Sequence, residues 1–97
     1  HVPARSFERQ RNYLIVNVFW DTMIRRRELL RLKMDDLNLT DGILKIHGKG
    51  RKQRYVPMGT NTIRLLHKYI NFHRKRVISV YLFCYRSGEP NKAQIYG

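Results

Sequence analysis

Apolar side chains recur at helical spacing in the first quarter of the chain. Four of them would share one face of a helix: Leu14, Ile15, Val18 and Phe19. This stripe predicts an amphipathic helix over residues 7–22, preceded by an extended leader. Ser6 is its predicted N-cap, and Arg9 and Arg11 are predicted to lie on its exposed faces.

A second, shorter helix is predicted over residues 24–33. Its buried side is supplied by three leucines, Leu29, Leu30 and Leu32. Four arginines make it unusually basic: Arg25, Arg26, Arg27 and Arg31. Asp35 and Asp36 then follow in a stretch that favours a turn.

The next pattern predicts a β-hairpin. Residues 43–47 form the first strand, and residues 53–56 form the return strand. Gly48-Lys49-Gly50 is the predicted turn, because glycine tolerates the positive φ that tight turns require. Pro57 is predicted to end the return strand, since it has no N–H for the ladder.

A third helix is predicted to begin at Thr60, which would be its N-cap. Its apolar stripe is Ile63, Leu66 and Ile70, and its basic end is Arg74-Lys75-Arg76. Residues 77–83 are predicted as a last strand, and residues 87–90 as a turn. The elements together predict one domain over residues 1–97 of the α+β class, with helices packed on a small antiparallel hairpin or sheet.

The charge balance narrows the function classes. Twenty Lys and Arg residues face seven Asp and Glu residues, which gives the 97-residue chain a formal net charge of +13. Such an excess repels itself in a compact fold, so a polyanionic partner is expected. Nucleic acid is the first candidate. An anionic membrane surface is less favoured, because the basic residues are spread over helices, hairpin and loops instead of one amphipathic face.

Other features of the sequence limit the cellular compartment and the cofactors that we expect. Cys84 is the only cysteine, so no internal disulfide is possible, and no Cys/His cluster has zinc-ligand spacing. No apolar run is long enough to cross a bilayer. We therefore expect an intracellular protein that needs no metal or other cofactor. Because the chain begins with His1, we expect a piece excised from a longer protein in preference to a processed small protein.

Three basic groups are candidate phosphate contacts: Arg25-Arg26-Arg27, Lys49-Gly50-Arg51-Lys52 with Arg54, and His73-Arg74-Lys75-Arg76. One such group alone is usually a solvated face, but three with few acidic residues favour phosphate contact. Lys49 lies between two glycines at the predicted turn. There it can donate to a phosphate oxygen or protonate a leaving oxygen, or it is simply solvated. The wider pattern of a phosphate-cradling Walker loop is absent.

The order of these pieces carries more information than any one of them. Three stretches are T-M-I-R-R-R-E-L-L-R-L at residues 22–32, Asp35-Asp36-Leu37, and I-L-K-I-H-G-K-G-R-K-Q-R-Y-V-P-M at residues 43–58. They resemble the tyrosine recombinases, the phage-integrase family of DNA breaking-and-rejoining enzymes. That family's pattern is T-G-L-R-x-x-E-L-x-x-L, a D-I/V-D element and a G-K-G-x-K-x-R-x-V-P-L hairpin. With Y-L-F at 81–83 and R-S-G-E-P at 86–90, the resemblance covers roughly residues 7–96.

The resemblance assigns roles to individual residues. Arg25 matches the catalytic arginine that clamps the scissile phosphate, for which a two-pronged guanidinium is suited. Lys49 matches the hairpin lysine that protonates the departing 5′ oxygen. Glu28, one helical turn after Arg25, either orients that arginine or is an exposed helix charge. Met23 replaces the family's glycine, which should cost backbone freedom without moving Arg25. Further DNA contacts are expected from Arg26, Arg27, Lys45, Arg51, Lys52 and Arg54.

The family's remaining catalytic groups are a later H-x-x-R, a further His or Trp, and a downstream tyrosine nucleophile. Residues 73–76 fit H-x-x-R but come too early in the family order, and Tyr96 precedes the nucleophile's place. We therefore expect the amino-terminal half of a catalytic domain. This half would bind double-stranded DNA as a monomer without cleaving it.

The parent protein that the resemblance implies is a cytoplasmic, nucleoid-associated recombinase encoded by a bacterium, an archaeon or a phage. It would act as a tetramer on paired sites and rejoin DNA through a phosphotyrosine intermediate, without metal or ATP. The alternative left open by the sequence is a self-contained basic nucleic-acid-binding module without catalysis.

Overall fold

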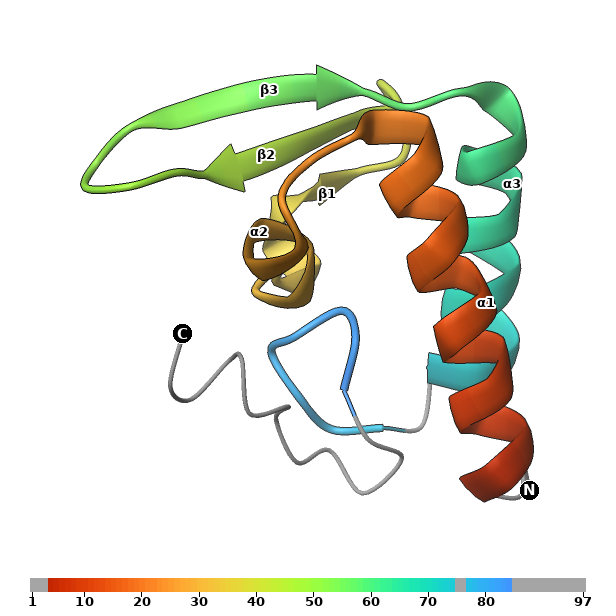
Figure 1. The fold of residues 1–97 in the computed structure, drawn as a ribbon. Helices are drawn as coiled ribbons and strands as arrows, with labels where there is room; N and C mark the ends of the chain where they lie inside the picture. Colours follow the sequence, from red (N-terminus) through yellow and green to blue (C-terminus); the bar gives the residue numbers. More distant parts are fainter. Residues whose placement is uncertain (1–3, 75–76, 85–97) are drawn as a thin grey trace.

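The computed structural model describes residues 4–74 and 77–84 and confirms the α+β class (Figure 1). In chain order the elements are α1 (Ala4–Thr22), α2 (Arg26–Leu30), the 3-10 turn η1 (Met34–Asp36), β1 (Leu37–Asn38), β2 (Ile43–His47), β3 (Gln53–Pro57), α3 (Thr60–Tyr69) and the π-helical turn η2 (Ile70–Arg74). Helices α1 and α3 pack side by side, and the hairpin of β2 and β3 extends away from them.

The predicted hairpin is confirmed: β2 covers the predicted residues 43–47, and β3 begins at the predicted Gln53 and ends at Pro57. The sheet has the antiparallel order β1-β2-β3, and β2 pairs with β3 from Ile43↔Pro57 to His47↔Gln53. The connection is longer than the predicted turn at Gly48-Lys49-Gly50: it spans residues 48–52 and is closed by the Gly48 N–H, which donates to the Lys52 carbonyl at 2.8 Å. Gly50 has φ +74°, so this turn uses the left-handed conformation that glycine adopts without strain.

Helix α1 presents its predicted stripe to the core, with three differences from the prediction. Leu14 and Val18 are buried as predicted, whereas Phe19 is exposed. The helix begins at Ala4, so Ser6 lies inside the first turn and is not the N-cap. The prediction for Arg11 was also wrong. Its side chain is buried because its guanidinium donates to the carbonyl of Cys84 at 3.1 Å.

The second and third helices also begin differently from the prediction. Helix α2 has only five residues, because the backbone of residues 32–34 is bonded instead to residues 80–82. Helix α3 has Gly59 as its N-cap in place of Thr60. The Gly59 N–H donates to the Asp21 carboxylate at 2.8 Å, which ties the start of α3 to the end of α1. The predicted stripe of α3 is centred on Leu66, which is fully buried.

The predicted strand over residues 77–83 does not form. This segment makes a single bridge, Lys33↔Tyr81, in which Leu82 donates to the Leu32 carbonyl at 2.9 Å. Three of its carbonyls, those of Val77, Ser79 and Tyr81, accept instead from the buried guanidinium of Arg74. A strand would need those carbonyls for a ladder, so the buried arginine replaces the sheet partner.

Arg74 is therefore removed from the third basic group as a phosphate contact. Lys75 and Arg76, the predicted turn at 87–90 and Tyr96 lie outside the described residues.

Met23 has φ +53°, the left-handed conformation in which glycine is favoured. Its N–H donates to the Phe19 carbonyl at 2.8 Å and closes the end of α1, while its side chain is 65% exposed. We expect Met23→Gly to raise the free energy of unfolding by about 1 kcal/mol, because it relieves backbone strain with little loss of burial. Thermal melting should show an increase of about 5 °C.

Val16→Gly is the matched control, since Val16 is exposed on the same helix with ordinary helical backbone. It should destabilise the chain by about 1 kcal/mol. Equal destabilisation by both glycines would show that the backbone at Met23 is not strained.

Candidate nucleic-acid interface

A groove of about 650 Å³ lies between the start of α2 and the hairpin turn. Its lining residues are Arg25, Glu28, Gly48, Lys49, Gly50, Lys52, Gln53 and Arg54. The two residues singled out by resemblance, Arg25 and Lys49, are 24 positions apart in sequence but lie in this one groove. Gln53 also lines it, although no sequence signal pointed to that residue.

Arg25 occupies the N-cap position of α2, with φ −68° and ψ 147°. Its backbone N–H donates to the Glu28 carboxylate at 2.9 Å, and its carbonyl accepts the first helical hydrogen bond, from Leu29. N-cap side chains normally accept a hydrogen bond from the helix, and a guanidinium has no acceptor. The Arg25 side chain is exposed and contributes no cap, so its charge is available at the groove.

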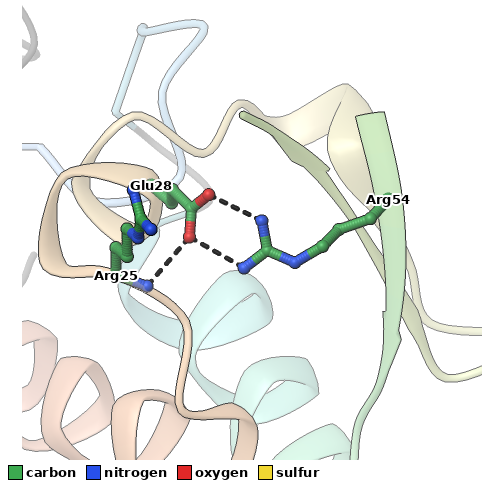
Figure 2. Close-up of polar contacts among 3 residues, drawn as sticks. All are labelled: Arg25, Glu28 and Arg54. Carbon is green, nitrogen blue, oxygen red and sulfur yellow. Dashed lines mark hydrogen bonds and ion pairs between the residues drawn. The ribbon is translucent and has the colours of Figure 1, made fainter. Parts of the chain in front are cut away.

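Glu28 joins α2 to the hairpin (Figure 2). Its Oε2 atom accepts from Arg54 Nη1 at 2.7 Å, and its Oε1 atom accepts from Arg54 Nη2 at 2.9 Å. Oε1 also accepts the Arg25 backbone N–H. The Glu28 side chain is only 10% exposed, so it is not the solvated helix charge that the sequence left as an option. It holds the Arg25 backbone, and Arg25 is itself one of the residues that line the groove.

Glu28 and Arg54 each stabilise the charged form of the other. Hydrogen bonding from Arg54 lowers the pKa of Glu28 below its ordinary value of 4.5, against the opposing effect of burial. The Arg25 N–H lowers that pKa further. In turn, the Glu28 carboxylate raises the pKa of Arg54. Both groups are thus charged at neutral pH, and the guanidinium of Arg54 is committed to Glu28.

Arg25, Lys49 and Lys52 therefore make the groove positive, because the charge of Glu28 is already matched by Arg54. Lys49 and Lys52 are exposed on the hairpin turn. The remaining predicted DNA contacts lie outside the groove lining: Arg26 and Arg27 on α2, Arg51 on the turn and Lys45 on β2. Of these, Arg26, Arg27 and Arg51 are exposed and Lys45 is half-buried opposite Tyr55.

A second polar contact lies near the turn end of the hairpin, at the last residue of β2, and the sequence did not indicate it. His47 Nε2 is 2.8 Å from Asp36 Oδ1, and Asp36 Oδ2 accepts the Lys33 N–H at 3.0 Å. The spacing of Lys33 and Asp36 is a local capping pattern that could have been found. The contact with His47 spans 11 residues and has no local signature.

Residues 4–74 and 77–84 contain neither a candidate metal centre nor a helix suited to span a membrane. No group of three or more His, Cys, Asp or Glu residues in those ranges could hold a metal ion. None of the helices there has the length and apolar character needed to span a bilayer.

The Phage integrase family model matches residues 2–96, so the chain belongs to the phage integrase family of tyrosine recombinases. The chain is 40% identical over 71 residues to tyrosine recombinase XerC of Chlorobaculum parvum, covering 73% of this chain and 21% of that protein. It is 38% identical over 93 residues to a tyrosine recombinase of Agathobacter rectalis, covering 90% of this chain and 30% of that protein. The family match does not favour the self-contained binding module.

Solved structures of recombinases share the fold. XerA recombinase superposes with a TM-score of 0.76 at 29% identity, over 91% of this chain and 33% of that one. XerH recombinase bound to its difH substrate, before cleavage, superposes with a TM-score of 0.74 at 31% identity, over 95% of this chain and 27% of that one. The chain thus spans about a fifth to a third of the length of these relatives.

Proposed function

We propose that the chain is the DNA-binding amino-terminal half of a recombinase catalytic domain, and that its groove holds a phosphate of double-stranded DNA. The observation that supports this most is the meeting of Arg25 and Lys49 in one positive groove. DNA as the partner is also supported by XerH, a structural neighbour seen with its difH substrate.

In the proposed chemistry, Arg25 and Lys49 have different roles. The Arg25 guanidinium donates to two oxygens of the scissile phosphate and stabilises the charge that builds up on them during transfer. Lys49 donates a proton to the 5′ oxygen as the P–O bond breaks, so that this oxygen leaves as a hydroxyl.

In the parent protein a tyrosine oxygen forms the new bond to phosphorus, and the phosphodiester energy is kept in the 3′-phosphotyrosine link. We assign that nucleophile to no described residue. Tetrameric action of the parent on paired sites and a monomeric state of this chain remain predictions.

Phosphate contact predicts a particular salt dependence. The affinity of the chain for duplex DNA should fall steeply as salt is added, because each neutralised phosphate releases counterion. Lys49→Ala should weaken binding to all DNA sequences alike and reduce the slope of log affinity against log salt by about 1. Fluorescence anisotropy with two unrelated duplexes measures both effects.

Lys68→Ala is the control, since Lys68 is an exposed lysine on α3 and its loss removes the same charge. It should leave the slope nearly unchanged. If the two variants behave alike, binding reflects overall charge and not the groove.

A further inference from the structure

We propose that His47 is a positioning residue, which holds the Lys49 turn over the groove through its contact with Asp36. This inference rests on the proposed function, because it concerns where the Lys49 ammonium is delivered. It adds to that function a residue that does not itself reach the phosphate.

The acceptor in the His47–Asp36 contact, the Asp36 carboxylate, is itself held in place. Asp36 belongs to η1, and its side chain is only 7% exposed. One carboxylate oxygen is occupied by the Lys33 N–H at 3.0 Å, which leaves the other oxygen aimed at His47 Nε2 at 2.8 Å. Asp36 therefore cannot follow a moving hairpin without giving up its backbone hydrogen bond.

His47 is placed where such a contact controls the turn. It is the last residue of β2 and precedes Lys49 by two positions. On the opposite leg of the hairpin, Arg54 of β3 is held by Glu28. Each strand is thus anchored to the body of the domain within a few residues of the turn, and by a different carboxylate.

The hairpin itself does not need the imidazole for its own formation. His47 and Gln53 are opposite each other in the strand register, and the Gly48 N–H closes the turn on the Lys52 carbonyl. The His47 side chain is half exposed, so it contributes little apolar burial. What the His47–Asp36 contact adds is a constraint on the direction of the hairpin relative to η1.

The direction of the hairpin matters because the Arg25 and Lys49 side chains must contact the same phosphate. Productive positions are held within fractions of an ångström by neighbouring contacts, and displacement of about 1 Å lowers the effect of a positioned group strongly. Leu44 and Ile46 are buried in the core, so only the turn end of the hairpin beyond Ile46 could move. Without the His47 contact, that end would be held to the body of the fold by the Arg54–Glu28 pair and would swing more widely. Lys49 would then spend less time at the phosphate held by Arg25.

A double-mutant cycle on duplex DNA binding tests this inference. His47→Ala should weaken binding by about two- to fivefold, and Lys49→Ala should cause little further loss in that background. His47→Gln should restore most of the affinity, because its amide N–H can donate to Asp36. Losses that add independently, or no loss with His47→Ala, would overturn the proposal.

Residual dipolar couplings of the backbone amides supply a readout of the hairpin's direction that does not involve DNA. Couplings at residues 48–52, compared with those of α1 and α3, should be averaged to smaller values in His47→Ala and return to the wild-type values in His47→Gln, with thermal melts confirming that each variant is folded. If the couplings respond but Lys49→Ala leaves DNA binding unchanged, the proposed function fails. If Lys49→Ala weakens binding but the couplings are the same with and without His47, the positioning role fails.

Discussion

Replacing Arg25 with serine is expected to make the chain more stable and at the same time to weaken its binding to duplex DNA. Arg25 has N-cap geometry but no acceptor to cap the helix. Serine supplies that acceptor, and with Glu28 three positions later it completes a capping box. The free energy of unfolding should rise by about 1 kcal/mol, which corresponds to an increase of about 5 °C in melting temperature.

The effect of Arg25→Ser on binding has the opposite sign. A charge-assisted contact with phosphate contributes about 1.5–3 kcal/mol, so affinity should fall by about tenfold or more. The slope of log affinity against log salt should drop by about 1. Arg31→Ser is the control, since Arg31 is exposed just beyond α2 and outside the groove lining. A serine variant that binds DNA as tightly as the wild type would exclude Arg25 from phosphate contact.

Replacing Glu28 with alanine is expected to destabilise the domain and to release the hairpin from α2. The variant loses both Arg54 contacts and the cap on the Arg25 N–H. Loss of the cap alone corresponds to about 1 kcal/mol, or a fall of about 5 °C in melting temperature. Glu28→Gln should lose less stability than Glu28→Ala, because its amide oxygen can still accept the Arg25 N–H. Glu8→Ala, which removes a carboxylate from α1, is the control.

The contribution of Glu28 should also depend on pH with a defined sign. Its pKa is lower in the folded chain than its ordinary value of 4.5, so the folded state favours the carboxylate. The resulting stability is present above that value and is lost as the pH falls through the folded pKa. The difference in melting temperature between wild type and Glu28→Gln should therefore shrink between about pH 7 and about pH 3. A difference that stays constant would mean that the charge of Glu28 contributes nothing.

The elements that were predicted correctly have local causes. The β2–β3 hairpin follows from strand-forming residues on both sides of a turn with a glycine at the left-handed position, Gly50. The buried stripe of α1 follows from its 3.6-residue spacing around Leu14 and Val18. Arg25 and Lys49 were singled out through the ordered run from residue 22 to residue 58, since neither is distinctive by charge alone. Their roles stay a prediction.

The features that were missed depend on contacts between distant residues. Residues 77–83 have strand-forming composition, but Arg74 takes three of their carbonyls. Arg54 was predicted only as a DNA contact, and its pairing with Glu28 was missed, because no local pattern reveals a carboxylate 26 positions away. Asp36 and His47 likewise meet only once the sheet has formed. Hydrophobic periodicity carries no information on such polar partners.

The central claim is that duplex DNA binds at the groove between α2 and the hairpin turn. Titration of the isotope-labelled chain with a short duplex, followed by amide NMR, tests it most directly. We predict the largest shifts at Arg25 and residues 48–50, with smaller ones at Glu28 and Gln53. Shifts confined to the exposed residues Phe72 and Ile78, with none in the groove, would contradict the account.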